Sequence, residues 1–395
     1  MSELITNKIT PGTGSSNTVT LGDSGDIFTI PAGVTIANSG TATGFSTDEI
    51  TKSSSEPTGT TNPSGGVGTV WLRTTTGEMY CCTDATTNAN VWTNIGDGTG
   101  SKPYTSTVAN GGTIATVGNY KIHSFTTSGT FSFTITTLGG DTTIEYLVLA
   151  GGGAGGSGYQ AGGGGAGGYR SSVFGESTGG GGTLETSPVV TASAYTVTVG
   201  AGGAISSQTL GGNGGNSSIV GAGVSVTATG GGGGASYHTS PYDGILGGSG
   251  GGAADHSGSA VGGAGTTDEG FAGGGAPGYA YPYGGGGGGG AGSAGLDGGN
   301  TGGATTSTAS NGGAGLNSSI TGSPIGYAGG GGGGSGGGGS AGIATHGGAD
   351  GVTTSQSASP APANRGGGGG GSYHTGYLGS TGGSGVVIIR YQFQQ

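Results

Sequence analysis

The chain ends in RGGGGGGSYHTGYLGSTGGSGVVIIRYQFQQ (residues 365–395), where a run of glycines and a short aromatic stretch precede a run of strand-forming residues. The opposite order occurs at EYLVLAGGGAGG (145–156), where an apolar strand leads directly into glycine. Because YLVLA (146–150) is apolar at every position, we expect this strand to be buried on both faces. We therefore predict that EYLVLA pairs with GVVIIRYQF (385–393) and that the two strands close a glycine-rich domain between them.

The composition leaves little material for an ordinary hydrophobic core. Glycine accounts for 110 of the 395 residues, and hydrophobic residues make up only 30%. Glycine at this level is typical of low-complexity, disordered chains. However, disordered chains are usually kept soluble by charge, and only 7% of these residues are charged. The low charge therefore favours an ordered glycine-rich structure.

The glycine runs are predicted to form short extended arms that pack side by side. Glycine is a poor helix former, and the strict three-residue period of collagen is absent. The polyproline II conformation has three residues per turn and leaves its backbone N–H and C=O groups free to bond to neighbouring arms. Glycine allows the closest approach between such arms. The runs lie at residues 162–165, 179–182, 230–234, 284–290, 329–334, 336–339 and 366–371.

The first part of the chain is predicted to be rich in β-structure. Residues 68–96 indicate a hairpin around the turn Thr76-Gly77 and a third strand that begins at Trp92. We expect packing, rather than carbohydrate binding, to be the role of its aromatic residues, which are Trp71, Tyr80 and Trp92.

Shifts in composition divide the chain into five parts, and α-helix is expected in none of them. The parts are a β-rich region for particle attachment or oligomerisation (1–50), a linker (51–66), a small Trp/Tyr β-module (67–104), β-strands leading into the distal domain (105–150), and a glycine-rich domain of polyglycine II helices bracketed by β-strands (151–395). Short strands in the first part bury little apolar surface on one chain, so self-association is expected.

The loops between the arms collect tyrosine and histidine. SYHTSPYDG (236–244), PGYAYPYG (277–284) and SYHTGYLG (372–379) stand next to glycine runs, and the first and third repeat the tetrapeptide SYHT. Tyr159, Tyr169 and Tyr327 are placed in the same class of exposed loop tips. Rigid, amphipathic Tyr and His side chains suit a recognition surface, although they could equally cap the bundle. The candidate binding residues are Tyr237, His238, Tyr242, Tyr279, Tyr281, Tyr283, Tyr373, His374 and Tyr377.

Several kinds of function are not supported by the sequence. A net charge of −11 with eight Lys and Arg residues argues against nucleic acid as a partner. No apolar run is long enough to span a membrane or to act as a secretory signal. The dinucleotide-like match at Gly151, Gly153 and Gly156 lacks the helix that the motif requires. Without metal-ligand spacing, paired carboxylates or a nucleophile–base pattern, we expect no metal, no cofactor and no enzymatic activity.

Residues 143–393 carry a resemblance to a known family. TTIEYLVLAGGGAGG (142–156), YTVTVGAGG (195–203) and GGSGVVIIRY (382–391) together resemble the glycine-rich domain that recurs in bacteriophage tail fibre and adhesin proteins. Residues 68–96 are similar to small Trp/Tyr modules of marine phage fibres. In the fibre-tip adhesins of T-even-type phages, receptor-binding loops project from a sandwich of polyglycine II helices. This chain departs from them because it carries its own β-rich N-terminal half.

The resemblance implies a virion protein, made in the host cytoplasm and released by lysis, that functions as a tail fibre or fibre-tip adhesin. Its partners would be a host cell-surface glycan or an outer-membrane protein, other virion proteins, and further copies of the chain, with a trimer favoured. A head-fibre or capsid decoration protein without a primary receptor role is the alternative. An ice-binding polyproline II bundle is a more distant alternative. It would need a flat, regular face of Thr or Ala, and the irregular Tyr loops argue against such a face.

Overall fold

The computed structural model describes residues 50–95, 106–139, 142–256, 259–276, 278, 283–299, 310–336, 339–353 and 356–393. The chain forms two compact units, Met1–Lys102 and Pro103–Gln395. In the described residues every regular element is a β-strand, which confirms the predicted all-β class. The region expected to attach to a particle, residues 1–50, lies outside the described part of the chain except for its last residue.

Sixteen strands are present in the described residues. Unit 1 contains β1 (Thr51–Ser53), β2 (Val70–Arg73), β3 (Met79–Asp84) and β4 (Val91–Asn94). Unit 2 contains β5 (Val108–Asn110), β6 (Thr113–Val117), β7 (Tyr120–Phe125), β8 (Gly129–Thr137), β9 (Glu145–Leu149), β10 (Tyr169–Ser171), β11 (Ala194–Val199), β12 (Ser217–Gly221), β13 (Val224–Ala228), β14 (Leu316–Ser318), β15 (Ile325–Tyr327) and β16 (Val386–Gln392).

The described residues of unit 1, 50–95, form a four-stranded sheet in the order β1-β2-β3-β4. The predicted hairpin corresponds to β2 and β3, and Trp92 lies in β4. Trp71 and Trp92 pack edge to face with their ring centroids 5.7 Å apart. The segment predicted to be a linker is part of this unit, because β1 pairs with β2 and the Trp71 indole N–H donates to the Ser55 carbonyl.

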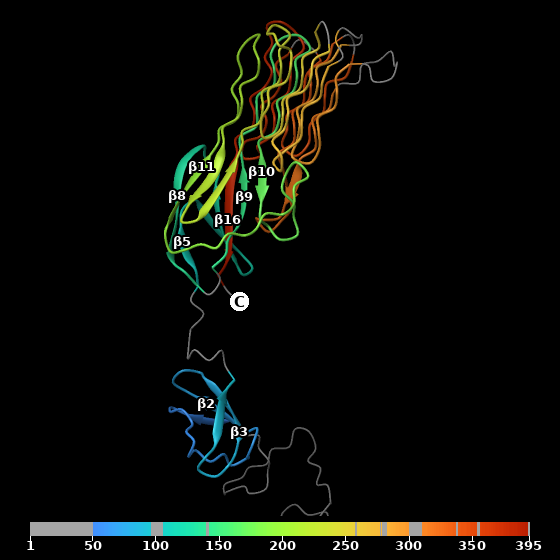
Figure 1. Cartoon of the computed structure of the whole chain (residues 1–395). Helices are drawn as coiled ribbons and strands as arrows, with labels where there is room; N and C mark the ends of the chain where they lie inside the picture. The colour runs from blue at the N-terminus through green and yellow to red at the C-terminus, as the bar shows by residue number, and fades with distance from the viewer. Residues whose placement is uncertain are drawn as a thin grey trace, which may run out of the picture. The chain divides into compact units, whose positions relative to one another are not determined.

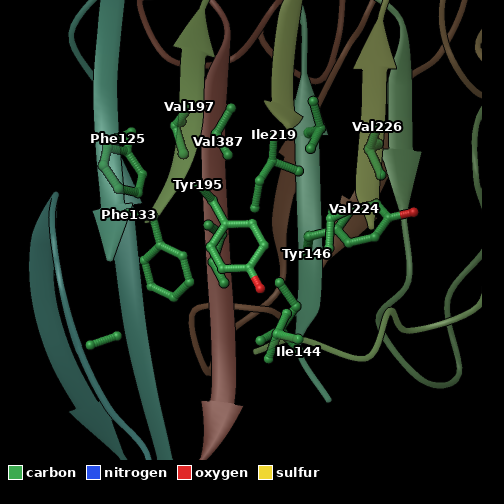
Figure 2. Packing of buried hydrophobic residues seen from close by; sticks show 14 of the residues in the cluster. Phe125, Phe133, Ile144, Tyr146, Tyr195, Val197, Ile219, Val224, Val226 and Val387 are labelled. Atoms are coloured by element: carbon green, nitrogen blue, oxygen red, sulfur yellow. The ribbon is translucent and has the colours of Figure 1, made fainter. Parts of the chain in front are cut away.

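Unit 2 is built on two five-stranded sheets packed face to face. Their strand orders are β10-β9-β16-β7-β6 and β13-β12-β11-β8-β5. The core between them combines side chains from both sheets, and Figure 2 shows Tyr146 and Val387 of the first sheet beside Phe133, Tyr195 and Ile219 of the second. These alternating strands supply the ordinary hydrophobic core that the glycine-rich part of the chain lacks.

The predicted pairing of the two bracketing strands is confirmed. Strand β16 lies antiparallel to β9, with Val387 opposite Val148 and Ile389 opposite Tyr146. The second face of this sheet is also buried, because Leu147 and Ile388 pack in a separate apolar cluster. That cluster includes side chains from the ends of the glycine-rich segments, which are Ala166, Ala291 and Ala328.

Extended glycine-rich segments run side by side away from the two sheets (Figure 1). We call these segments arms. The fully buried ones are the inner arms, which lie at residues 151–157, 161–168, 230–236, 249–255, 284–291, 328–335 and 366–372. Their interior is therefore made almost entirely of backbone.

Hydrogen bonds between the arms follow a period of three residues. In arm 161–168, the N–H groups of Ala161, Gly164 and Gly167 donate to Ser372, Gly369 and Gly366 of one neighbouring arm. The N–H groups of Gly162 and Gly165 donate to arm 230–236, and those of Gly163 and Ala166 donate to arm 284–291. Three residues per turn is the geometry of polyproline II, so this is the pattern expected of packed polyglycine II helices.

The same arm also accepts hydrogen bonds from three further neighbours. Carbonyl groups of 161–168 accept from Gly153 and Gly156, from Ser249 and Gly252, and from Gly331 and Gly334, which belong to three other inner arms. Every buried N–H of arm 161–168 therefore has a partner although none is paired in a strand ladder.

Close approach of the backbones explains why the inner arms are built of glycine. A Cβ atom added at Gly163 would lie 2.2 Å from the carbonyl oxygen of Gly331, and one added at Gly164 would lie 2.2 Å from that of Gly153. Real Cβ atoms do not approach backbone this closely, so the arms would have to separate.

At the edge of the bundle the burial pattern also repeats every three residues. In the outer segment 260–265, Ala260 and Gly263 are buried whereas Val261 and Ala264 are exposed. The side-chain oxygens of Asn and Asp on outer segments accept backbone N–H groups of adjacent arms in place of another carbonyl. The pairs are Asn213–Gly233, Asn216–Gly230, Asp243–Val261, Asp297–Gly275, Asn311–Ile343 and Asp350–Ala344.

One predicted arm is absent from the bundle. Residues 179–182 form a turn in which Gly180 and Gly181 have φ angles of +66° and +76°. The prediction for this run was wrong because glycine permits both an extended arm and a left-handed turn, so a glycine run alone does not select one. The run 336–339 includes residues 337 and 338, which lie outside the described part of the chain.

A buried carboxylate lies where the arms meet the sheets. The Glu269 Oε2 atom accepts the Thr229 N–H at 2.7 Å, and the side chain packs against the Gly168 backbone. Burial raises the pKa of Glu269, and its hydrogen bonds to Thr229 only partly oppose this shift. The raised pKa means that the charged form of this group is disfavoured in the folded state.

Replacing Glu269 by glutamine is expected to flatten part of the pH dependence of stability. A carboxyl whose pKa is raised on folding contributes stability at acid pH and loses that contribution as the pH rises through its folded pKa. Relative to the variant, the wild type should therefore become less stable over the range that begins at about pH 4.3, the ordinary pKa of glutamate, and extends upward through the raised pKa of the folded state. The difference in melting temperature between the two proteins, followed by Tyr fluorescence, measures this contribution. A difference that stays constant over this range would contradict it.

Candidate functional site

The two SYHT repeats both lie against Tyr159. The turn 158–160 connects arm 151–157, which follows β9, to arm 161–168, which precedes β10, so it lies at the end of the bundle away from the sheets. Arms 230–236 and 366–372 run antiparallel to 161–168 and carry the repeats to the same end. We call residues 158–160, 237–243 and 373–378, together with His256, the tip.

Ring contacts join the two repeats through Tyr159. The Tyr159 ring centroid lies 5.7 Å from that of Tyr237 and 6.2 Å from that of Tyr373, in both cases edge to face. The ring centroids of His238 and His374 lie 6.0 Å and 5.3 Å from it. Corresponding residues of the two repeats therefore contact the same ring.

The serine of each repeat fixes its loop to the turn that carries Tyr159. The Ser236 hydroxyl donates to the Ser157 carbonyl at 2.6 Å, and the Ser372 hydroxyl donates to the Gly158 carbonyl at 2.9 Å. Both serines are buried. A Cβ atom added at Gly158 would lie 2.6 Å from the His238 ring, so that imidazole packs directly on the turn. The aromatic side chains therefore stand on a rigid base.

His256, which follows arm 249–255, extends the cluster. It stacks on Tyr242 with the ring centroids 3.8 Å apart and contacts Tyr237 at 4.4 Å. On the other side, Tyr377 contacts His374 at 5.9 Å. Most of the cluster is half-buried, whereas His238 is exposed.

The candidate residues of the third loop are only partly described. Tyr279 and Tyr281 lie outside the described residues. The Tyr283 carbonyl accepts the Gly336 N–H at 3.0 Å. The Tyr373 ring lies on Gly336, because a Cβ atom added there would be 1.7 Å from that ring. Tyr283 is therefore linked through its backbone to the segment that supports Tyr373.

Two tyrosines that the sequence placed among the exposed loop tips are core residues. Tyr169 and Tyr327 are 0% and 4% exposed and lie in the apolar cluster beneath the first sheet. They occur at the opposite ends of their arms from the tip, where the arms join β10 and β15. The assignment was wrong because a Tyr beside glycine looks the same at either end of an arm.

Tyr159 and His256 are absent from the predicted set of binding residues, although the structure places them at its centre. Each follows an arm that runs away from the sheets. The direction of the arms alternates along the chain from β9 onward, and this alternation is the signal that could have identified both residues.

The tip has an unusual charge composition. No Lys or Arg occurs in the sequence between Arg170 and Arg365. The side chains of Asp243 and Asp255 accept the backbone N–H groups of Val261 and Gly284, so both acids take part in holding the loops. No group of three or more His, Cys, Asp or Glu side chains suited to a metal ion occurs in the described residues.

The comparisons identify a family for most of unit 2. No curated protein matches the chain. Within the described part of the chain, no helix is long and apolar enough to cross a membrane. A family model described as a glycine-rich domain matches residues 126–392, which include β9, the arms, the tip and all of β16. The chain therefore belongs to the glycine-rich domain family.

Proposed function

We propose that this chain is a bacteriophage virion protein, a tail fibre or fibre-tip adhesin that binds a receptor on the host surface through its tip. The glycine bundle is the scaffold that presents the tip. The N-terminal region would attach the chain to the particle and assemble it with further copies, with a trimer favoured. We propose binding, without catalysis or a cofactor, as its activity.

The observation that carries this proposal is the convergence of the two SYHT repeats on Tyr159 at one end of a rigid bundle. Rigid aromatic side chains on fixed loops lose little conformational entropy when they bind a partner. A residue needed only to close the bundle would be expected to be buried, as Tyr169 is. His238 is instead exposed.

The exposed side chains along the bundle do not favour ice binding. The exposed side chains there include Val261, Leu296, Asp297 and Ile343. These side chains differ in size and charge, whereas ice binding would need a regular face of Thr or Ala. The tip is the better supported recognition surface.

Replacing Tyr159 by alanine is expected to reduce adsorption to host cells about tenfold or more, which is the range for a central aromatic residue at an interface. The change removes the ring that both SYHT repeats contact. The labelled full-length chain is incubated with a panel of bacterial strains, and the bound fraction is measured on the strains that adsorb the wild type.

Two further variants make this measurement specific. Tyr377→Ala changes a peripheral ring and should weaken adsorption without disturbing the central contacts. Phe174→Ala is the matched control, because Phe174 is 88% exposed and its N–H bonds to Glu145 at the sheets. Wild-type adsorption by both tip variants, or no adsorption of the wild type to any strain, would argue against the proposal.

A further inference from the structure

We infer that the tip recognises an uncharged saccharide, an assignment that rests on the proposed function and specifies its receptor. The inference combines two features of the tip, which are a chain of aromatic rings and the absence of permanent positive charge. These two features favour a neutral sugar as the partner over an acidic glycan, a phosphorylated lipid or a protein.

The rings form a continuous series of contacts across the tip. From Tyr373 through Tyr159 to Tyr237, successive ring centroids lie 6.2 Å and 5.7 Å apart. The series continues through His256 to Tyr242 with separations of 4.4 Å and 3.8 Å. A sugar ring has an apolar C–H face and a hydroxyl-bearing edge. Tyrosine offers the same combination, an aromatic ring with a polar tip.

The polar groups of the tip are mostly hydroxyl groups. They include the hydroxyl groups of Thr239, Ser240 and Thr375, the phenol groups of the tyrosines and the imidazoles of His238 and His374. Such groups donate and accept hydrogen bonds, as sugar hydroxyl groups do. Sugars could therefore be bound without any ion pair.

Anionic receptors are disfavoured by the missing cations. Carboxylate and phosphate groups are usually recognised by Arg or Lys, which supply charge and directional donors. The nearest Arg residues in sequence are Arg170, Arg365 and Arg390, and all three are engaged elsewhere. Arg170 and Arg390 pair with Glu185 and Glu145, and Arg365 donates to the Gly326 carbonyl.

Protein receptors are disfavoured by the makeup of the same surface. Protein interfaces rely on Arg and on large apolar anchors as well as on tyrosine. The tip has no Arg, and the strongly exposed aliphatic residue Ile343 lies outside it, whereas Val261 borders it through the bond from its N–H to Asp243. The tip combines rings with hydroxyl groups and has few aliphatic side chains.

The test uses the full-length chain and the cells that adsorb it. One sample of cells is treated with periodate, which cleaves sugar diols, and another with protease. Polysaccharide extracted from the same cells is separated on an anion exchanger into neutral and acidic fractions, and each fraction is added as a competitor. Adsorption is measured at a low NaCl concentration and at a tenfold higher one.

We expect periodate, but not protease, to abolish adsorption. The neutral fraction should compete, and tenfold more salt should change the bound fraction less than about twofold because no ion pair is screened. Tyr159→Phe, which keeps the ring, should retain most of the adsorption that Tyr159→Ala loses.

Other outcomes would overturn the inference. Competition by the acidic fraction alone, or sensitivity to protease alone, would assign an anionic glycan or a protein as the receptor and would leave the adhesin function intact. If neither fraction competed, the inference would also be overturned. Absence of adsorption to any strain would count against the adhesin function itself.

Discussion

Replacing Gly288 by alanine is expected to destabilise unit 2 by about 3 kcal/mol or more. A Cβ atom at this position would lie 1.9 Å from the carbonyl oxygen of Gly164 and 2.4 Å from its carbonyl carbon. Neither atom belongs to a side chain that could rotate away, so arms 284–291 and 161–168 would have to separate. Separation would also lengthen the hydrogen bonds that the Gly163 and Ala166 N–H groups donate to the Gly286 and Gly289 carbonyls.

Gly284→Ala in the same arm is the matched control. The nearest atom to a Cβ atom there is the Gly299 nitrogen at 3.6 Å, which is an ordinary contact, and its φ angle is not left-handed. Alanine at such a position stabilises a protein by about 0.4–1 kcal/mol because it restricts the unfolded chain. Thermal unfolding followed by Tyr fluorescence should thus move the two variants in opposite directions. Equal melting temperatures for Gly288→Ala and the wild type would show that the arms are not close-packed.

The tryptophans provide an internal reference for this measurement. The chain has two, Trp71 and Trp92, and both belong to unit 1. The Trp fluorescence transition is therefore expected to be unchanged in both glycine variants. A parallel loss of the Trp transition would indicate a general folding defect.

The sequence predicts the frame of unit 2 better than it predicts the tip. Apolar runs such as YLVLA and VVII have one obvious solution, which is a strand buried on both faces, and β9 and β16 do pair. The need to satisfy every buried N–H likewise predicts lateral bonding between glycine arms. Both predictions follow from local composition together with a single physical requirement.

The arrangement at the tip depends on information that local composition does not contain. Whether a loop lies at the tip or beside the sheets depends on the direction of its arm, and this direction reverses at every turn. Tyr159 and Tyr169 are separated by one arm and have similar glycine-rich surroundings, yet one lies at the tip and the other is buried beneath a sheet. A residue can be assigned to one end of the bundle only by counting the arms from β9 onward. A glycine run such as 179–182, which forms a turn in place of an arm, makes a count based on the sequence wrong.

Truncation of the chain after Gly385 is expected to abolish folding of unit 2. The deleted strand, β16, is the middle strand of its sheet and pairs with both β9 and β7. Its buried side chains are Val386, Val387, Ile388, Ile389 and Tyr391. Burial of one such side chain contributes about 1.5–3 kcal/mol. Their combined loss is comparable to the entire stability of a typical domain, which is about 5–15 kcal/mol.

The effect is expected to reach the glycine arms as well as the sheet. Leu149 and Ile388 lie in the apolar cluster that includes the arm residues Ala166, Ala291 and Ala328. Without this attachment the arms would lose their fixed ends, and a single arm cannot offset its ordering cost of roughly 1–2 kcal/mol per residue. Amide hydrogen exchange should therefore show protected glycine N–H groups in the wild type and none in the truncated chain.

A peptide in trans distinguishes loss of the strand from general damage. Because an open position between two strands can accept an added strand, a synthetic peptide spanning residues 385–393 is expected to restore part of the protection. A chain shortened only by residues 394 and 395 is the matched control and should behave as the wild type. If the chain ending at Gly385 kept protected arms, the bundle would be stable by itself, and β16 would be an accessory to the fold rather than the strand that closes it.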